Sequence, residues 1–127
     1  MAAPEPIAEL QERYPGALVA GCSTAGEILD TEVSDEGLVA TALSFEATRV
    51  ALAMEQDVTE RSGNELGRRL AAQLAQPDLV QVLLFADGIG VNGSELVRGI
   101  EAGLANGVSV TGGLAGDGGR FQQTLVR

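Results

Sequence analysis

Residues 79–88, LVQVLLFADG, decide the fold. Between positions 79 and 86 the side chains are almost continuously apolar, which is typical of a central strand covered on both faces of its sheet. This predicted strand runs directly into Asp87-Gly88, which is turn sequence. The stretch therefore predicts a buried strand with a short loop at its carboxyl end.

Helices are predicted on both sides of this strand. Thr59 caps a helix over 60–75, and Asn92 begins a second helix in which Glu95 is the capping-box partner. Asn106-Gly107 ends the second helix. The predicted core-facing stripes are Leu66, Leu70 and Leu74 in the first helix and Leu96, Ile100 and Leu104 in the second.

Further strands flank these helices at 48–54 and 108–111. The resulting β-α-β-α-β order predicts an α/β fold, a mixed sheet with helices packed on it. A glycine-rich loop is expected at 112–119, and a last strand at 121–127.

The N-terminal part predicts a short amphipathic helix over 4–14 and a buried strand at 17–21. Residues 28–37 are turn-rich, and 37–45 has the period-2 pattern of a strand that pairs with 48–54 as a hairpin. The chain begins without a strand before its first helix and stops in mid-strand. We interpret residues 1–127 as a single domain that is an incomplete piece of a larger α/β module.

Composition narrows the possible functions. The net charge is −10, with eight arginines and no lysine, which argues against nucleic acid and anionic membrane surfaces as partners. No apolar run approaches the roughly 20 residues that span a bilayer, and the N-terminus does not resemble a signal peptide. The single cysteine predicts a reducing, cytoplasmic environment.

Histidine is absent from the sequence. Cys–His and Ser–His–Asp catalysis, His-ligated zinc and haem held by a proximal histidine therefore cannot come from these residues. We expect no cofactor.

Three predicted strands each end in a loop of small residues. In an α/β sheet, ligands bind outside the carboxyl ends of the strands, so parallel strands would bring these loops to one edge. Glycines let a ligand approach the backbone, and carboxylates bind an ammonium group, a combination that suits an amino acid. The predicted ligand-binding residues are Gly21, Cys22, Ser23, Thr24, Gly26, Glu27, Asp87, Gly88, Gly112, Gly113, Gly116 and Asp117.

Simpler explanations exist for each loop. Glycine-rich turns occur in α/β proteins merely to reverse the chain, and Asp87 can be an ordinary turn residue. Thr24 and Glu27 have the spacing of a capping box on a short helix. Cys22 as a nucleophile would need Glu27 or Asp87 as its base, and a carboxylate raises the pKa of a thiol.

Four blocks of the sequence resemble the N-terminal part of the FIST domain: PGALVAGCSTAGEI (15–28), GLVATALSF (37–45), LLFADGIGVNGSELVRGI (83–100) and VSVTGGLAGDGGRFQQTLV (108–126). The resemblance implies an intracellular sensory domain of signalling proteins that binds a small ligand such as an amino acid. It also implies two partners, a C-terminal FIST part and a signalling output domain or protein. Some FIST proteins sense nitric oxide through haem held by histidine, a ligand that this chain lacks.

Two other functions stay open at this point. One is an enzyme that uses Cys22 or a backbone oxyanion cradle. The other is an interaction scaffold without a ligand.

Overall fold

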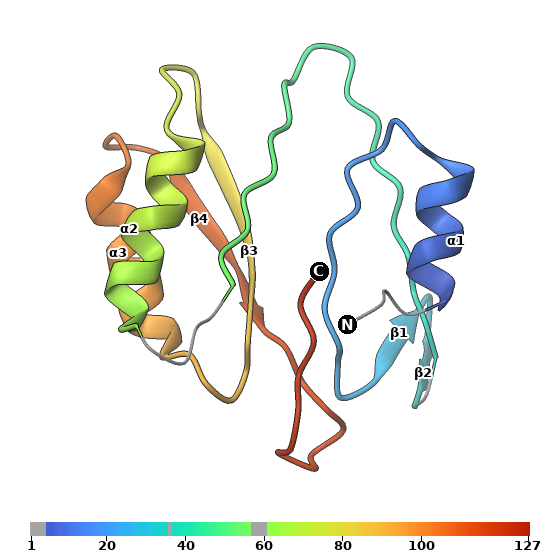
Figure 1. Cartoon of the computed structure of the whole chain (residues 1–127). Coiled ribbons are helices and arrows are strands. Elements are labelled where there is room, and N and C mark those ends of the chain that lie inside the picture. The colour runs from blue at the N-terminus through green and yellow to red at the C-terminus, as the bar shows by residue number, and fades with distance from the viewer. Residues whose placement is uncertain (1–4, 36, 57–60) are drawn as a thin grey trace.

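The computed structural model describes residues 5–35, 37–56 and 61–127 (Figure 1). It has an α/β fold, as predicted. The helices and strands are α1 (Glu5–Arg13), β1 (Glu27–Leu29), β2 (Glu32–Ser34), α2 (Gly63–Leu74), β3 (Gln81–Ala86), α3 (Gly93–Gly103) and β4 (Ser109–Leu114).

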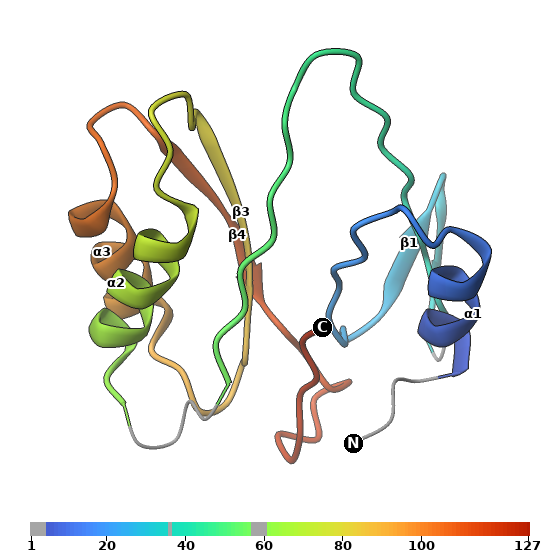
Figure 2. The ribbon, with the colours of Figure 1, turned by 45° about the horizontal axis from the view of Figure 1, so that its top comes forward.

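The C-terminal part, residues 61–127, is built around β3 and β4. These strands pair in parallel, from Gln81 opposite Ser109 to Ala86 opposite Leu114. The α3 helix makes the crossover between them, and α2 lies beside it on the same face of the sheet (Figures 1 and 2). The parallel pairing expected of the strands is therefore present for the two that precede the Asp87-Gly88 loop and the loop after β4.

Side-chain caps fix where both helices begin. The Asn92 side chain accepts a hydrogen bond from the Glu95 N–H, which confirms the predicted start of α3. The Ser62 side chain accepts one from the Glu65 N–H, so α2 begins after Ser62. Thr59, the predicted cap, lies outside the described residues.

The core lies between the two helices and β3. Leu66, Leu96 and Ile100 are buried there with Ala86, as the leucine stripes predicted. The prediction that β3 is covered on both faces is wrong, because the helices cover one face only and Leu83 on the other is 62% exposed.

Glycines set how closely the two helices pack. A Cβ atom on Gly67 of α2 would lie 2.2 Å from the carbonyl oxygen of Leu96, and one on Gly99 of α3 would lie 2.2 Å from that of Asn64. No carbon atom fits at such distances, so the helix backbones are in direct contact at these positions.

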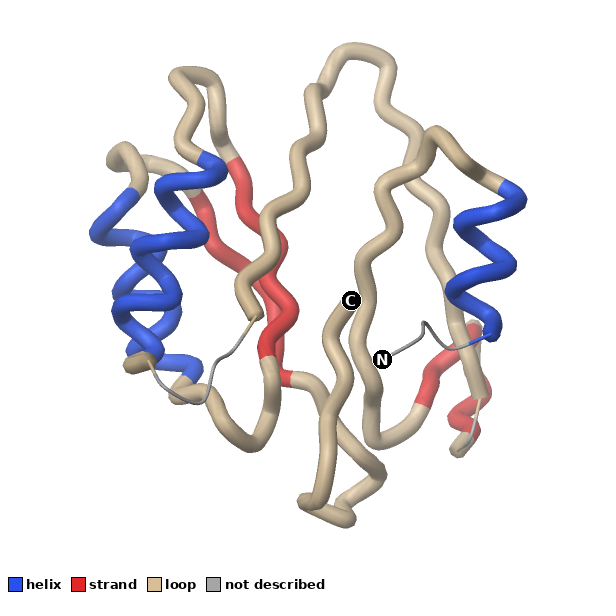
Figure 3. The backbone as a smooth tube through the Cα atoms, in the orientation of Figure 1, coloured by secondary structure: helices blue, strands red, loops and turns tan. Residues whose placement is uncertain are grey.

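Several predicted strands are absent. Residues 17–21, 37–45 and 48–54 are not in strands, and 121–127 contributes only one bridge, between Cys22 and Val126. Figure 3 shows these segments as loop. They have the side-chain pattern of strands, but within the described residues they lack a neighbouring strand along their length.

Two predicted loops contain strands instead. Residues 27–34 form the hairpin of β1 and β2, in which Asp30 takes a positive φ of 55° at the turn. The predicted loop at 112–119 is shorter than expected, because Gly112, Gly113 and Leu114 continue β4 beside Leu84, Phe85 and Ala86.

Replacing Gly99 by alanine should destabilise the protein. Alanine normally favours a helix interior over glycine by about 1 kcal/mol, but the clash with Asn64 forces the helices apart, and overpacking costs about 1–3 kcal/mol. Chemical denaturation of the chain should therefore show a net loss for Gly99→Ala. The matched control is Gly93→Ala in the same helix, where the new Cβ would lie 3.4 Å from the Leu114 side chain. Equal stability of the two variants would contradict the close helix contact.

Candidate functional site

The carboxyl ends of β3 and β4 bring two of the small-residue loops together. The N–H of Ala115 donates to the carbonyl of Ala86 over 2.8 Å, which extends the ladder one residue past the end of β4. A Cβ atom on Gly88 would lie 1.9 Å from the Ala115 carbonyl oxygen. The Asp87-Gly88 loop therefore lies directly against the loop that follows β4.

The third loop reaches the same place from the N-terminal part. The N–H of Gly116 donates to the carbonyl of Ser23 over 2.9 Å, and a Cβ atom on Gly116 would lie 2.9 Å from the Ala25 nitrogen. The expected convergence of the three loops is thus confirmed, with Gly88 and Gly116 at the points of closest approach.

Thr124, which the sequence did not single out, ties the loops together. Its hydroxyl donates to Asp87 Oδ2 over 2.9 Å and accepts from the Gly88 N–H over 3.1 Å. The next residue, Leu125, donates its N–H to the Ser23 hydroxyl oxygen over 2.9 Å. A threonine inside a predicted strand carries no local signal of this role, because its partners are distant in sequence.

Asp87 and Asp117 both stabilise loops through their carboxylates. Asp87 Oδ1 accepts from the N–H groups of Ile89 and Gly90, which makes Asp87 the turn residue that the simpler explanation proposed. Asp117 is only 7% exposed and accepts from the N–H groups of Phe121, Gln122 and Gln123.

These hydrogen bonds lower the pKa of both carboxyl groups. Burial acts to raise the pKa of Asp87, but the N–H groups of Gly90 and Ile89 and the Thr124 hydroxyl outweigh it. For Asp117 the main cause of the lowered pKa is the Gln122 N–H, and burial opposes it only in part. The charge of Arg120 also favours ionised Asp117. Both groups are therefore carboxylates at neutral pH.

Two hollows lie at this junction. The smaller, of about 170 Å³, touches all three loops, and the larger, of about 370 Å³, lies beside the C-terminal segment. The smaller is lined by Ala25, Gly88, Ile89, Ala115, Gly116, Asp117, Gly119, Phe121 and Thr124. The larger is lined by Ser23, Asp117, Arg120, Gln122, Gln123, Thr124 and Leu125.

The linings of the two hollows include exposed backbone, the large apolar residues Ile89, Phe121 and Leu125, and one cation, Arg120. Ile89 and Phe121 are 49% and 82% exposed although both are strongly apolar. The Arg120 guanidinium lies over Gly118, where a Cβ atom would be 3.4 Å from one of its nitrogens. Ile89, Phe121 and Arg120 were not among the predicted ligand-binding residues, because each belongs to the site only through the folded loops.

Other predicted ligand-binding residues do not line either hollow. Gly112 and Gly113 lie within β4. Gly21 and Cys22 pair with the C-terminal segment: the Gly21 N–H donates to the Arg127 carbonyl over 2.8 Å, and Cys22 bridges Val126.

Asp87 likewise lines neither hollow. The remaining predicted residues, Thr24, Gly26 and Glu27, form the turn that enters β1. The Thr24 hydroxyl donates to Glu27 Oε1 over 2.6 Å, and the Gly37 N–H donates to Oε2 over 3.0 Å. Glu27 is in strand β1, so the capping-box interpretation of this pair is wrong. Gly26 has a positive φ of 154°, and a Cβ atom there would lie 3.3 Å from Asp35 Oδ1 and 3.5 Å from the Ser34 carbonyl oxygen.

The Cys22 hypothesis finds no support in this geometry. Burial raises the pKa of the thiol, which lowers the fraction of reactive thiolate. Its two candidate bases, Glu27 and Asp87, accept hydrogen bonds from other groups. Within the described residues, no three acidic or cysteine side chains are grouped to hold a metal ion.

Comparison with known proteins gives one match. A family model described as FIST N domain matches residues 2–127. Searches of curated proteins and of solved structures return no match. In the part of the chain that the structure covers, no helix is long and apolar enough to cross a membrane.

The lowered pKa values predict an acid-sensitive loop junction. A carboxyl group whose pKa is lower in the folded state stabilises that state above its unfolded pKa of about 3.9, and this contribution is lost as pH falls through the folded value. We expect the melting temperature to fall between about pH 5 and pH 2.

The variant Asp117→Asn should melt at a lower temperature at neutral pH and show a flatter pH dependence than the wild type. Glu101→Gln on the exposed face of α3 is the control and should reproduce the wild-type profile. Parallel pH profiles of Asp117→Asn and wild type would show that Asp117 does not contribute through its charge.

Proposed function

Because the chain belongs to the FIST N domain family, we propose that it is a sensory domain for signal transduction that binds a small molecule where its three loops converge. The observation that carries this proposal is the smaller hollow, whose walls come from all three loops. A ligand there contacts segments that are far apart in the sequence. Ligand binding therefore stabilises the arrangement in which these segments lie together.

The lining suits an amino-acid-like ligand. Arg120 lines the larger hollow, which shares Asp117 and Thr124 with the smaller one, and supplies a cation for a carboxylate. Arginine binds carboxylates through a planar pair of donors. Ile89 and Phe121 supply apolar surface for a side chain. Asp117 lines both hollows, and its Oδ1 accepts one described hydrogen bond, from the Phe121 N–H, which leaves capacity for another from an ammonium group.

The proposed partners follow from the sensory role. Ligand occupancy shifts the position of this domain relative to a C-terminal FIST part, which transmits the change to a signalling output domain or protein. We place this function in the cytoplasm, in keeping with the single cysteine.

Filling the smaller hollow should abolish binding without unfolding the protein. Ala25 is exposed and lines the hollow, so Ala25→Leu extends a side chain into it. Isothermal titration with a panel of the standard amino acids should detect a ligand that binds the wild type and does not bind Ala25→Leu. The control is Ala72→Leu on the exposed side of α2, which should bind as the wild type does. An absence of binding to wild type across the panel would contradict the proposed ligand class.

Removing the positive charge of Arg120 should weaken the binding of ligands that carry a carboxylate. Arg120→Gln should weaken binding of an amino acid by about tenfold or more, the loss expected for a charge-assisted hydrogen bond of about 1.5–3 kcal/mol. The same ligand as its neutral amide should bind both proteins equally. If amide and acid lose affinity alike in Arg120→Gln, the variant has disturbed the loop and Arg120 does not recognise the carboxylate.

A further inference from the structure

The N-terminal part of the chain, residues 5–56, lacks a packed core. Every buried residue in the described structure lies at or beyond Gly63. The N-terminal part nevertheless contains most of the large apolar side chains that are exposed. They are Tyr14, Leu18, Ile28, Leu29, Val33, Leu38, Val39, Leu43, Phe45, Val50, Leu52 and Met54.

The accessible area shows how much surface this leaves uncovered. The chain exposes 9384 Å², whereas a compact protein of 13.0 kDa exposes about 6,300 Å². The excess of about 3,000 Å² exceeds the roughly 800 Å² that each partner buries in a standard interface. It is on the scale of a permanent interface.

Residues 37–56, which we call the arch, also have an unpaired backbone. They rise from β2, turn near Glu46 and descend beside β3 as extended chain without strand partners (Figures 1 and 3). Within the described part of the chain, no backbone–backbone hydrogen bond involves the arch. Unpaired peptide groups beside exposed apolar side chains form a template on which another polypeptide strand can pair, covering both at once.

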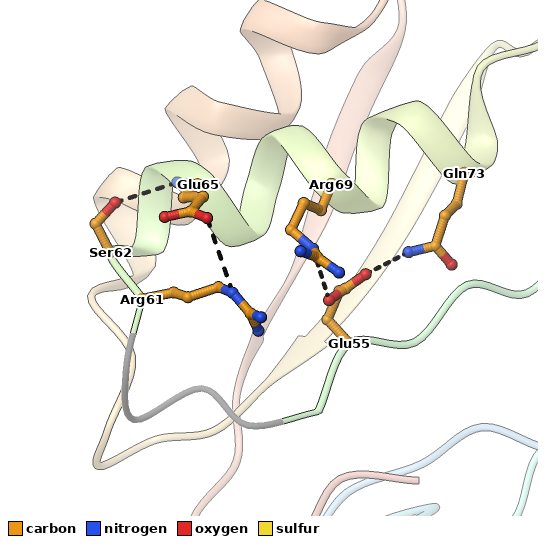
Figure 4. Close-up of polar contacts among 6 residues, drawn as sticks. All are labelled: Glu55, Arg61, Ser62, Glu65, Arg69 and Gln73. Atoms are coloured by element: carbon orange, nitrogen blue, oxygen red, sulfur yellow. Dashed lines mark hydrogen bonds and ion pairs between the residues drawn. The ribbon is translucent and has the colours of Figure 1, made fainter.

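Two ion pairs and a hydrogen bond connect the descending side of the arch to the C-terminal part. Glu55 is bonded to Arg69 over 3.0 Å and to Gln73 over 2.6 Å, both on α2 (Figure 4). Arg49 forms an ion pair over 2.5 Å with Asp78, which lies shortly before β3 begins at Gln81. The arch is therefore attached to the C-terminal part while its backbone stays open for pairing.

Charge is distributed unevenly between the two parts. Residues 1–56 contain ten carboxylates and two arginines, which leaves −8, whereas residues 61–127 contain six of each and are neutral. A second copy of this chain would bring the same negative charge against the same surface. The charge distribution instead favours a basic partner.

We propose that the arch is a docking surface for a basic, strand-forming polypeptide, which adds strands beside residues 37–54 and covers their apolar side chains. The partner's peptide groups satisfy the open backbone, its alternating apolar side chains cover the exposed ones, and its cations face the acidic N-terminal part. This interaction goes beyond the proposed ligand site, because it uses neither hollow.

Hydrogen exchange of the 127-residue chain tests the proposal with a defined probe. The probe is a synthetic peptide of alternating valine and threonine with two lysines at each end, and the matched peptide has glutamates in place of the lysines. We expect the lysine peptide to slow amide exchange across residues 37–54, and added salt to weaken the effect. The glutamate peptide should leave exchange unchanged.

A pair of variants locates the binding surface. Leu43→Asn places a neutral polar group in the proposed pairing surface and should weaken binding of the lysine peptide by about tenfold or more, because apolar contact is lost and the amide must be desolvated. Leu83→Asn, on the exposed face of β3, is the control and should bind as the wild type does.

Three results would overturn the proposal. One is unchanged exchange at 37–54 with the lysine peptide, and another is equal protection by both peptides, which removes the role of charge. The third is a free chain that sediments as a dimer with 37–54 already protected, which would assign the surface to a second copy. Loss of amino-acid binding with peptide protection intact would refute only the ligand site.

Discussion

The structure depends on the direct contact between the backbones of α2 and α3. Gly67 and Gly99 each face a backbone carbonyl of the opposite helix at a distance that admits no side chain. Because close-packed interiors do not deform continuously, this contact fixes both helices against each other and buries Leu66, Leu96 and Ile100 against β3. The α3 helix is also the crossover between β3 and β4, so the same contact sets where the two strands end and hence where their loops meet.

Backbone segments also approach each other closely at the loop junction, and this explains why glycines are found there. The sequence suggested glycines that make room for a ligand. Gly88 faces the Ala115 carbonyl and Gly116 faces the Ala25 nitrogen, so these two glycines make room for other loops of the same chain. The hollow that remains is formed around these contacts, with Asp87, Asp117 and Thr124 holding the loops through hydrogen bonds. Any ligand would therefore bind beside the residues that maintain the junction, and only some of its contacts would be with predicted residues.

The sequence predicted those features that depend on neighbouring residues. The Asn92 cap, the leucine stripes and the strand over 81–86 are local signals, and the parallel pairing followed from the element order. The strands predicted within residues 37–54 are absent. A period-2 pattern indicates which side chains share a face, but it carries no information on whether a partner strand is present. Thr124 and Arg120 were missed because their roles arise only when distant segments meet. Asp117 was predicted as a site residue because it is a carboxylate in a loop that follows a strand. Its three hydrogen bonds from the N–H groups of later residues depend on how that loop folds.

The loop junction lies where the two unlike parts of the chain touch. Ser23 and Ala25 come from the acidic N-terminal part, whereas Gly88 and Gly116 come from the neutral, packed C-terminal part. A partner on the arch would stabilise the N-terminal part in this arrangement, and a ligand in the hollow would hold the same part against the C-terminal loops. Two binding events that both stabilise one arrangement of the same segments are coupled, and each must raise the affinity of the other by the same factor. A sensory domain needs such a coupling, and here the covalent path from the arch to the junction is short, through β2, β1 and the turn at Thr24.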